Sequence, residues 1–343
     1  MGKTLREGLR KFAEWYTYMK ILITGIHGFV GSNLVKALSK EHEIYGLDII
    51  APKKDGVKST FGWAHLDTKE ILEVDAIIHL AGKAHDTKNQ SSAETYFRVN
   101  TELTKKIFDY YLASKAKKFI FFSSVKAAAD RVEGEFVDEN VEPAPKGPYG
   151  ESKIAAERYI LDQFKDYSLK FKDSSEVESI ETRSVYVFRP CMIHGPGNKG
   201  NLNLLYGIVK KGIPWPLGAF ENRRTFTSID NLCYIIKGLL TKDIESGIYN
   251  INDDEAVNTN ELIEIICNAM GKKAHIWRIP RGLMEGFAKI GGLLHLPLNP
   301  ERLQKLTENY VSSNAKIKKA LGIEQLPVRA KDGLTKTIKS FNS

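Results

Sequence analysis

The segment from Lys20 to Leu38 constrains the fold more than any other part of this sequence. A short run of β-branched and aliphatic residues, typical of a buried strand, is followed by Gly25, Gly28 and Gly31 and then by apolar residues at helical spacing. In a strand–turn–helix unit the first glycine permits a tight turn, and the second lets backbone N–H groups approach a pyrophosphate. The third lets the helix pack close to the strand. The segment therefore predicts a phosphate cradle at a helix N-terminus.

An acidic residue follows at the position that such a cradle requires. The next strand pattern, Glu43 to Asp48, ends in a carboxylate 23 positions after Gly25. A carboxylate at this distance binds the ribose hydroxyls of a dinucleotide. Because it repels a 2′-phosphate, the pattern predicts NAD rather than NADP.

From residue 20 to about residue 125 the sequence alternates between strand and helix patterns. Strands are expected near 20–24, 43–48, 75–80 and 118–123. Such alternation predicts a parallel sheet covered by helices on both faces, an α/β fold of the Rossmann-like, doubly wound type. Asn100 is expected to open and cap a helix over 101–114, and His65–Asp67 is expected to be a short strand. Asp67 would then either lie near an adenine or cap a helix.

Composition excludes several classes of protein. The 343 residues are 42% hydrophobic and 27% charged, as in ordinary globular proteins. The net charge of +8 is spread along the chain without an aromatic-interleaved basic block, so nucleic acid is not an expected partner. Three widely separated cysteines indicate neither disulfides nor a zinc site, and we expect no metal and a reducing cytoplasm. The absence of an 18-residue apolar run argues against membrane insertion.

Residues 1–18 form a basic N-terminal extension that stands apart from the rest. The segment could be a basic amphipathic helix at a membrane surface. We favour a frayed extension, or an upstream start before Met19.

Hydroxyl and phenol groups follow the strand pattern 118–122. Ser123 and Ser124 come at its carboxyl end, which is the edge of an open α/β sheet where ligands bind. Tyr149 and Lys153 begin a later helix, and their spacing places both on one face. A neighbouring ammonium favours the phenolate, so we expect the pKa of Tyr149 to fall from about 10 toward neutrality. The same spacing recurs elsewhere in the chain, and only the context singles out this pair.

These motifs resemble the extended short-chain dehydrogenase/reductase family, the NAD-dependent nucleotide-sugar epimerases and dehydratases. The resemblance covers roughly residues 19–190, and later features extend it to about 322. It implies that Tyr149 is the base, that Lys153 holds the nicotinamide ribose, and that Ser124 bonds the sugar oxygen. It also implies cofactor contacts at Gly25, His27, Gly28, Phe29, Val30, Asp48, Leu66, Asp67, Leu80, Ala81, Gly82, Lys83, Asn100, Ser123, Tyr149 and Lys153.

The resemblance divides the chain into an NAD-binding Rossmann domain at 19–189 and mainly a smaller α/β lobe for the sugar nucleotide at 190–343. Late strands of the first domain would interleave with this lobe. A charged stretch at 166–182 is expected to be a surface insertion after a helix ending near Lys165. The apolar stretch 280–298 is expected to form a helical hairpin over the substrate.

Substrate contacts are expected from both parts of the chain, at Ser124, Tyr149, Met192, Asn203, Trp215, Leu217, Arg224 and Arg302. The resemblance implies that Asn203, before a helix, and Arg224 bind the diphosphate, and Arg302 or Lys305 would make the second basic contact. Trp215 and Leu217 would form a flat slot for the base. Met192 stands where many sugar epimerases carry an asparagine, and His194 replaces a tyrosine.

The resemblance implies a UDP-sugar 4-epimerase, of the UDP-glucose or UDP-N-acetylglucosamine type, in surface-polysaccharide precursor synthesis. The alternative is an NAD(P)H-dependent C-4 reductase of a UDP-4-keto-6-deoxy-N-acetylhexosamine. A third hypothesis is a non-catalytic protein that binds NAD(P) as a sensor. A homodimer through helices at 101–115 and 149–165 is also expected.

Overall fold

A computed structural model describes residues 18–68, 72–84, 91–172, 183–198, 200–294 and 298–341. The predictions for residues 1–17, and for 173–182 of the expected insertion, lie outside the described residues. Within the described ranges, no helix combines the length and the apolar character needed to cross a membrane.

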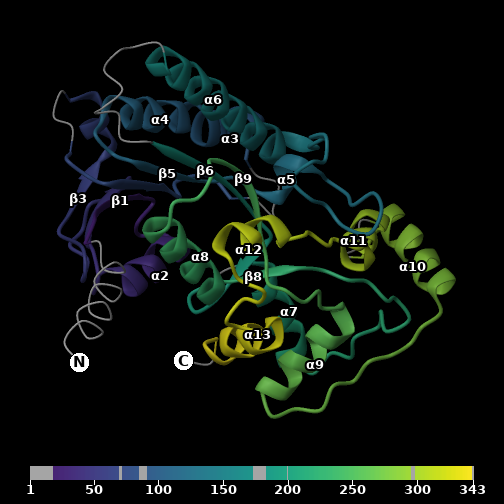
Figure 1. Ribbon diagram of the computed structural model, residues 1–343. Helices are drawn as coiled ribbons and strands as arrows, with labels where there is room; N and C mark the ends of the chain where they lie inside the picture. The colour runs from purple at the N-terminus through teal and green to yellow at the C-terminus, as the bar shows by residue number, and fades with distance from the viewer. Residues whose placement is uncertain are drawn as a thin grey trace.

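A parallel sheet forms the centre of the molecule (Figure 1). In the described part of the chain its seven strands lie in the order β3-β2-β1-β4-β5-β6-β9, and every neighbouring pair is parallel. The strands are β1 (Lys20–Thr24), β2 (Glu43–Asp48), β3 (Ser59–Gly62), β4 (Ala76–His79), β5 (Lys118–Phe122), β6 (Ser184–Pro190) and β9 (Gly247–Ile251). The strand order reverses between β1 and β4, where a crevice for ligands opens in such sheets. The predicted doubly wound α/β fold is confirmed.

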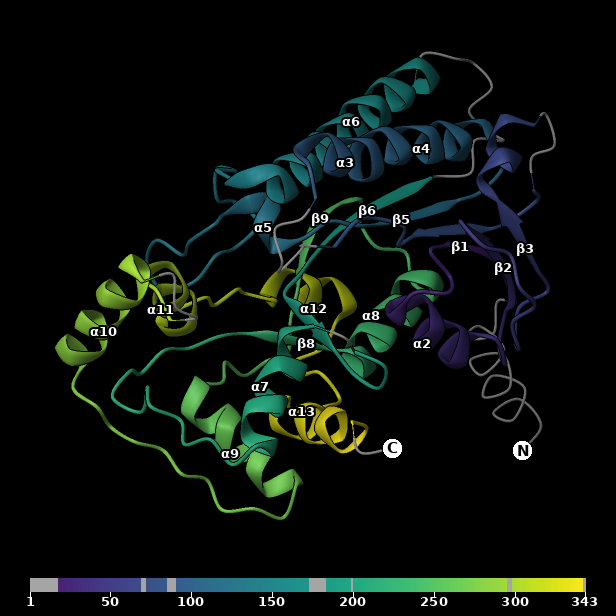
Figure 2. The same cartoon turned by 180° about the vertical axis from the view of Figure 1, so that it is seen from behind.

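Alternate residues of the central strands point to two different layers of helices. Ile21 and Ile23 of β1 belong to one core cluster, together with side chains of α2 (Phe29–Leu38), α8 (Ile229–Thr241) and α12 (Ala315–Leu321). Leu22, between them, belongs to the opposite cluster, with α4 (Leu103–Ala113) and α6 (Gly147–Lys172). Figures 1 and 2 show the two layers on opposite faces of the sheet.

A second core lies beside the carboxyl ends of the strands. Here β7 (Met192–His194) pairs in parallel with β8 (Phe226–Ser228). The helices around this core are α7 (Asn201–Lys210), α9 (Thr259–Ala269), α10 (Arg281–Leu293), α11 (Pro300–Thr307) and α13 (Ala330–Lys339). The stretch 280–298 was expected to form a helical hairpin, but the structure describes one helix there, α10; the helix that packs against it, α11, begins only at Pro300.

Local predictions near the ligand edge were less accurate. Residues 65–67 are not a strand, because β3 ends at Gly62 and the short 3₁₀-helix η1 (Trp63–Asp67) follows. Asn100 does not open a helix: the helical segment begins at α3 (Ala93–Tyr96), capped by Ser92, and continues through the π-helical turn η2 (Phe97–Glu102) into α4. The Ser124 side chain caps the short helix α5 (Val125–Ala128).

Two further helix boundaries also differ from the predictions. The helix that was expected to end near Lys165 runs to Lys172 as α6. Asn203 lies in the first turn of α7 rather than before it.

Candidate active site

In the glycine loop after β1, Gly25 and Gly31 have no room for a side chain. Gly25 has a φ of 67°, in the left-handed region, and a Cβ there would lie 3.0 Å from the Ala81 backbone. A Cβ on Gly31 would lie 2.6 Å from the Gly25 carbonyl oxygen. The loop therefore brings bare backbone and the start of α2 to the switch point between β1 and β4, which suits a diphosphate.

Asp48, at the end of β2, holds this loop in place. One carboxylate oxygen accepts the His27 backbone N–H at 2.9 Å, and the other accepts that of Ile49 at 2.7 Å. Asp48 also lines a cavity of about 650 Å³. The cavity wall consists of Gly25, Gly28, Asp48, Ile49, Trp63, Leu80, Ala81, Gly82, Arg98, Val99, Glu102, Leu103 and Lys106. A glycine-lined cradle beside a ribose-type carboxylate fits a dinucleotide.

Several predicted cofactor residues lie outside this wall. Leu66 packs against the α4–α6 core, and the Asp67 side chain is 72% exposed, 3.8 Å from Lys106. Phe29 and Val30 pack against the core at the start of α2. Trp63, Arg98 and Lys106 also line the cavity, although no sequence motif indicated them. Trp63 immediately follows β3, so a correct end for that strand would have indicated it.

Asn100 fastens the chain next to the cavity. Its carbonyl oxygen accepts the Lys83 N–H at 2.7 Å, and its amide donates to the Lys83 carbonyl at 3.2 Å and to Ser152 at 3.0 Å. A Cβ on Gly82 would lie 3.1 Å from both the Asn100 side chain and the Lys153 ammonium. Gly82, which lines the cavity, therefore lies close to the Lys153 ammonium.

The structure brings Tyr149 and Ser124 together. The two side chains are hydrogen-bonded, and the Tyr149 ring also meets Tyr96 edge-on at a centroid distance of 6.1 Å. Burial raises the pKa of Tyr149, although the hydrogen bond to Ser124 opposes this shift. The expected lowering of that pKa is therefore wrong for this structure. Desolvation of the phenolate dominates, and Lys153 is not among the groups that shift it.

Lys153 follows Tyr149 by one turn of α6, and its ammonium donates to the Phe122 carbonyl at the end of β5, at 2.8 Å. Burial lowers the pKa of Lys153 to about 8, and the neighbouring Glu157 carboxylate opposes this shift. Glu157 in turn accepts a bidentate contact from Arg189, at 3.1 Å from Nε and 2.6 Å from Nη2. Ser123 also donates to Glu157. Sequence reasoning missed the Glu157–Arg189 pair, which no local pattern marks.

The predicted diphosphate arginine has other partners here. The Arg224 guanidinium donates to the carbonyls of Lys305 and Glu308, and it lies 3.8 Å from the Glu308 carboxylate. Burial lowers the pKa of Arg224. Arg302 is exposed on α11, and Lys305 pairs with Glu301 at 2.7 Å. Arg224 therefore joins the segment just before β8 to the end of α11 in this structure, and its contact with a diphosphate stays a prediction.

The remaining predicted substrate residues belong to the second core. Trp215 and Leu217 are 4% and 3% exposed, so their side chains do not form an open slot for a base. Met192 is half-buried in β7 and packs against the same core. The Asn203 amide oxygen is buried and has no partner among the described residues, so it retains capacity to accept a hydrogen bond.

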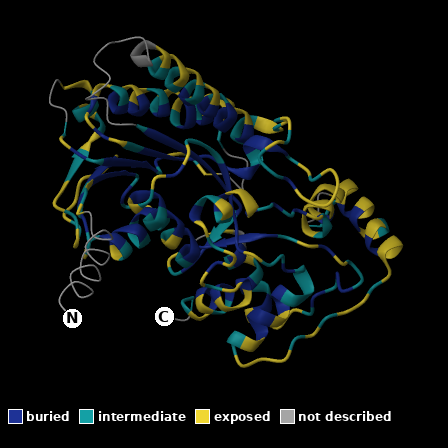
Figure 3. Cartoon of the chain, in the orientation of Figure 1, coloured by how far each residue is buried: buried dark blue, intermediate teal, exposed yellow. Residues whose placement is uncertain are grey.

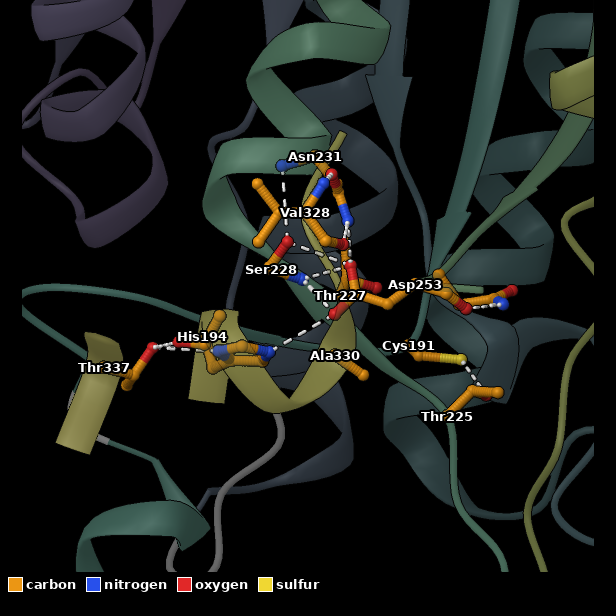
Figure 4. A network of polar contacts seen from close by, with 12 residues as sticks. Cys191, His194, Thr225, Thr227, Ser228, Asn231, Asp253, Val328, Ala330 and Thr337 are labelled. Carbon is orange, nitrogen blue, oxygen red and sulfur yellow. Dashed lines mark hydrogen bonds and ion pairs between the residues drawn. The ribbon is translucent and has the colours of Figure 1, made fainter. Parts of the chain in front are cut away.

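A buried Ser–His–Asp cluster next to this core is structural rather than hydrolytic (Figure 4). Ser228 donates its hydroxyl to Asp253 at 2.9 Å, while His194 lies 3.5 Å from the same carboxylate and 2.9 Å from Thr337. Asn231 also donates to Asp253, at 2.7 Å. Because these side chains are almost fully buried, the cluster fixes α8 and α13 to the end of β9. No trio of potential metal ligands is grouped anywhere in the described ranges.

Comparisons with known proteins agree with this geometry. The model of the NAD dependent epimerase/dehydratase family matches residues 21–252. A UDP-glucose 4-epimerase of Vibrio cholerae is 28% identical over 94% of this chain and 95% of its own length. The N-acetyl-alpha-D-glucosaminyl-diphospho-ditrans,octacis-undecaprenol 4-epimerase of Escherichia coli O157:H7 is 26% identical, covering 87% of this chain and 84% of that protein.

Solved structures share the fold. UDP-glucuronic acid 4-epimerase from Bacillus cereus, in complex with NAD, superposes with a TM-score of 0.69 at 20% identity, over 94% of this chain and 99% of that chain. The Bordetella bronchiseptica enzyme WbmG, in complex with NAD, gives a TM-score of 0.70 at 18% identity, over 95% and 94%. With the family model matching most of the chain, this protein belongs to the NAD dependent epimerase/dehydratase family, as an extended short-chain dehydrogenase/reductase enzyme.

Proposed function

We propose that this enzyme is a UDP-sugar 4-epimerase that oxidises the sugar at C4 and reduces it again. The observation that carries the proposal is the hydrogen-bonded Tyr149–Ser124 pair, together with a lysine whose ammonium lies next to Gly82, a residue of the cavity wall. The names of two relatives and of one structural neighbour, all 4-epimerases, support the reaction class. Two other neighbours were solved with UDP or with UDP-glucose, which supports a UDP-linked substrate.

NAD is the cofactor of this family, and the residues of this chain fit it. Bare glycine backbone would face the diphosphate, and Asp48 would bind the adenosine ribose. The chemistry that bound NAD supplies is transfer of a hydride from the sugar carbon and back. In this proposal the Ser124 hydroxyl holds the C4 oxygen while Tyr149 takes its proton and later returns it. Because burial raises the pKa of Tyr149 in this structure, the proposal requires a cation that stabilises the phenolate, and Lys153, one helical turn further along α6, is the residue that would supply it.

Replacing the phenol tests the mechanism. Tyr149→Phe should lower turnover by about 100-fold or more, because proton transfer is lost, and leave NAD affinity nearly unchanged. Tyr206→Phe is a matched control, since Tyr206 has the same spacing to Lys210 but lies in the second core. Epimerisation would be followed by chromatography of the UDP-sugars, and NAD binding by calorimetry. Full activity of Tyr149→Phe would refute the mechanism.

A C-4 reductase remains the second candidate, because Met192 occupies the position where many epimerases carry an asparagine. The same residues would then act once, in the reducing direction. Purified protein incubated with UDP-glucose or UDP-N-acetylglucosamine and no added cofactor separates the two. Formation of the C4 epimer supports epimerisation, whereas activity only on a 4-keto sugar with added reduced nicotinamide supports the reductase.

The homodimer stays a prediction. We propose that it forms through the outer faces of α4 and α6, which pack together along one face of the sheet (Figure 1). Sedimentation of a monomer at micromolar concentration would contradict it. The cytoplasmic location and the domain boundary near residue 190 also stay proposals.

A further inference from the structure

Among the described residues, four charged side chains line the cofactor cavity, and three of them come from one helical segment. Arg98 and Glu102 lie in η2, and Lys106 lies in α4. The fourth is Asp48, at the end of β2. Figure 3 shows that the strands of the sheet are mostly buried. The polar contacts of a bound cofactor therefore have to come from the strand ends and from this helical segment.

The charges on the helical segment differ in their partners. Glu102 accepts a hydrogen bond from Lys105 at 2.9 Å, and Lys105 is not part of the cavity wall. Lys106 lies 3.8 Å from the Asp67 carboxylate. Arg98 is exposed, and its guanidinium has neither a hydrogen-bond partner nor an ion-pair partner within the described ranges. Arg98 is therefore the cavity cation whose charge no carboxylate offsets.

Another part of the same wall is suited to an anion. Helix α2 begins directly after Gly28, has no side-chain cap and carries no acidic residue in its first turn. The first N–H groups of such a helix, together with its dipole, favour a negative charge. Gly25 and Gly28 line the cavity together with Arg98, and as glycines they offer backbone donors only. The cationic side chain for an anion at this point has to come from elsewhere in the wall.

The backbone that carries Arg98 is fixed at the edge of the cavity. Asn100, two residues later, accepts the Lys83 N–H at 2.7 Å. A Cβ on Gly82, which lines the cavity, would lie 3.1 Å from the Asn100 side chain. The segment is therefore held against the residues that follow β4, where the sheet has its switch point.

A bound dinucleotide adds the negative charge of its diphosphate to a cavity that already contains the Asp48 carboxylate. A helix N-terminus supplies only a partial positive charge, whereas a guanidinium supplies a full one. The planar fork of arginine also fits two phosphate oxygens at once.

We propose that Arg98 binds the diphosphate of the cofactor, together with the N-terminus of α2. The guanidinium donates to phosphate oxygens that the backbone of the glycine loop leaves free, and its charge offsets theirs. The inference rests on NAD as the cofactor of this family. It holds for an epimerase and for a reductase alike, because it concerns cofactor binding and not the sugar chemistry.

Titration calorimetry without a sugar substrate tests this contact. Arg98→Gln should lower the affinity of the full-length protein for NAD and for ADP-ribose by about tenfold or more, because a charge-assisted hydrogen bond is lost. Arg98→Lys, which keeps the charge but not the fork, should lose less. The difference between Arg98→Gln and the wild type should shrink in high salt. The matched control is Arg158→Gln, since Arg158 is exposed on α6 and does not line the cavity.

Urea unfolding without added NAD checks that the variant is folded. Because Arg98 is exposed and has no partner in the described chain, Arg98→Gln should unfold at the same urea concentration as the wild type. Unchanged NAD affinity in Arg98→Gln would overturn the proposal, and so would an equal loss in Arg158→Gln. A loss of affinity for NADP alone would also overturn it, because the guanidinium would then face a 2′-phosphate. None of these results depends on turnover, so they are distinct from a failure of the proposed epimerisation.

Discussion

The buried pair of Glu157 and Arg189 gives the sharpest prediction. Both side chains are 1% exposed, and the carboxylate accepts Nε at 3.1 Å and Nη2 at 2.6 Å as well as the Ser123 hydroxyl. Glu157→Gln preserves the shape but removes the negative charge. The new amide N–H donors also have to face the guanidinium donors of Arg189.

The expected cost follows from this burial. Removing one member of a buried ion pair typically lowers the free energy of unfolding by about 3–5 kcal/mol, because the other charge is left uncompensated. Replacing both members, as in Glu157→Leu/Arg189→Met, should cost less than the single change, since neither charge of the pair is then left without its partner. The pKa of Lys153 should also fall below its present value of about 8, because Glu157 no longer opposes the effect of burial.

Urea unfolding at a fixed NAD concentration measures these differences. The control is Glu73→Gln, in the pair of Glu73 with Lys115, whose side chains are 75% and 86% exposed. That exposed pair should contribute almost nothing. If Glu157→Gln changed stability no more than the control, or if the double variant were as unstable as the single one, the buried-charge argument would be refuted.

Three further predictions concern the cofactor cavity and the ammonium. Gly31→Ala should abolish NAD binding in a titration, because its Cβ would lie 2.6 Å from a carbonyl oxygen, whereas Gly207→Ala, with nothing within 4 Å, should not. Asp48→Ala should weaken NAD affinity by about tenfold or more in calorimetry, since the His27 N–H loses its charged acceptor. Lys153 has a lowered pKa of about 8, so its charge is complete well below pH 8 and is lost as the pH rises through that value. The kcat should therefore fall on the alkaline side near pH 8, and a profile flat beyond pH 10 would contradict this role.

The parts of the fold that the sequence predicted depend on short-range patterns. The glycine loop and Asp48 are fixed by spacing within one βαβ unit, and the parallel sheet covered on both faces follows from the alternation of strands and helices. The Tyr149 prediction needed only a helical spacing and a preceding strand end that carries hydroxyls. In the structure Tyr149 and Ser124 are indeed hydrogen-bonded.

The features that the sequence did not predict depend on contacts between distant segments. Trp63 lines the cavity because β3 ends three residues earlier than the expected strand begins. Asn100 makes its hydrogen bonds to Lys83 and Ser152 from within the π-helical turn η2, and no capping rule predicts such a turn. Arg224 binds the end of α11, more than 80 residues later in the chain. Its charge and sequence context predicted an arginine that binds the diphosphate. Only the fold shows that the guanidinium already donates hydrogen bonds to the carbonyls of Lys305 and Glu308.

The raised pKa of Tyr149 shows that a lysine four residues further along the helix does not by itself lower the pKa of the phenol. Tyr149, Lys153 and Glu157 lie at i, i+4 and i+8 on α6, and β6 supplies Arg189 at the end of this row. Burial disfavours the charge on Lys153, so the ammonium depends on the Glu157 carboxylate, which the buried Arg189 guanidinium binds. The charge on Lys153 is therefore held, through Glu157, by a residue of a different element, β6. A sequence that kept Tyr149 and Lys153 but lost Arg189 would retain the motif without the buried pair that supports this charge.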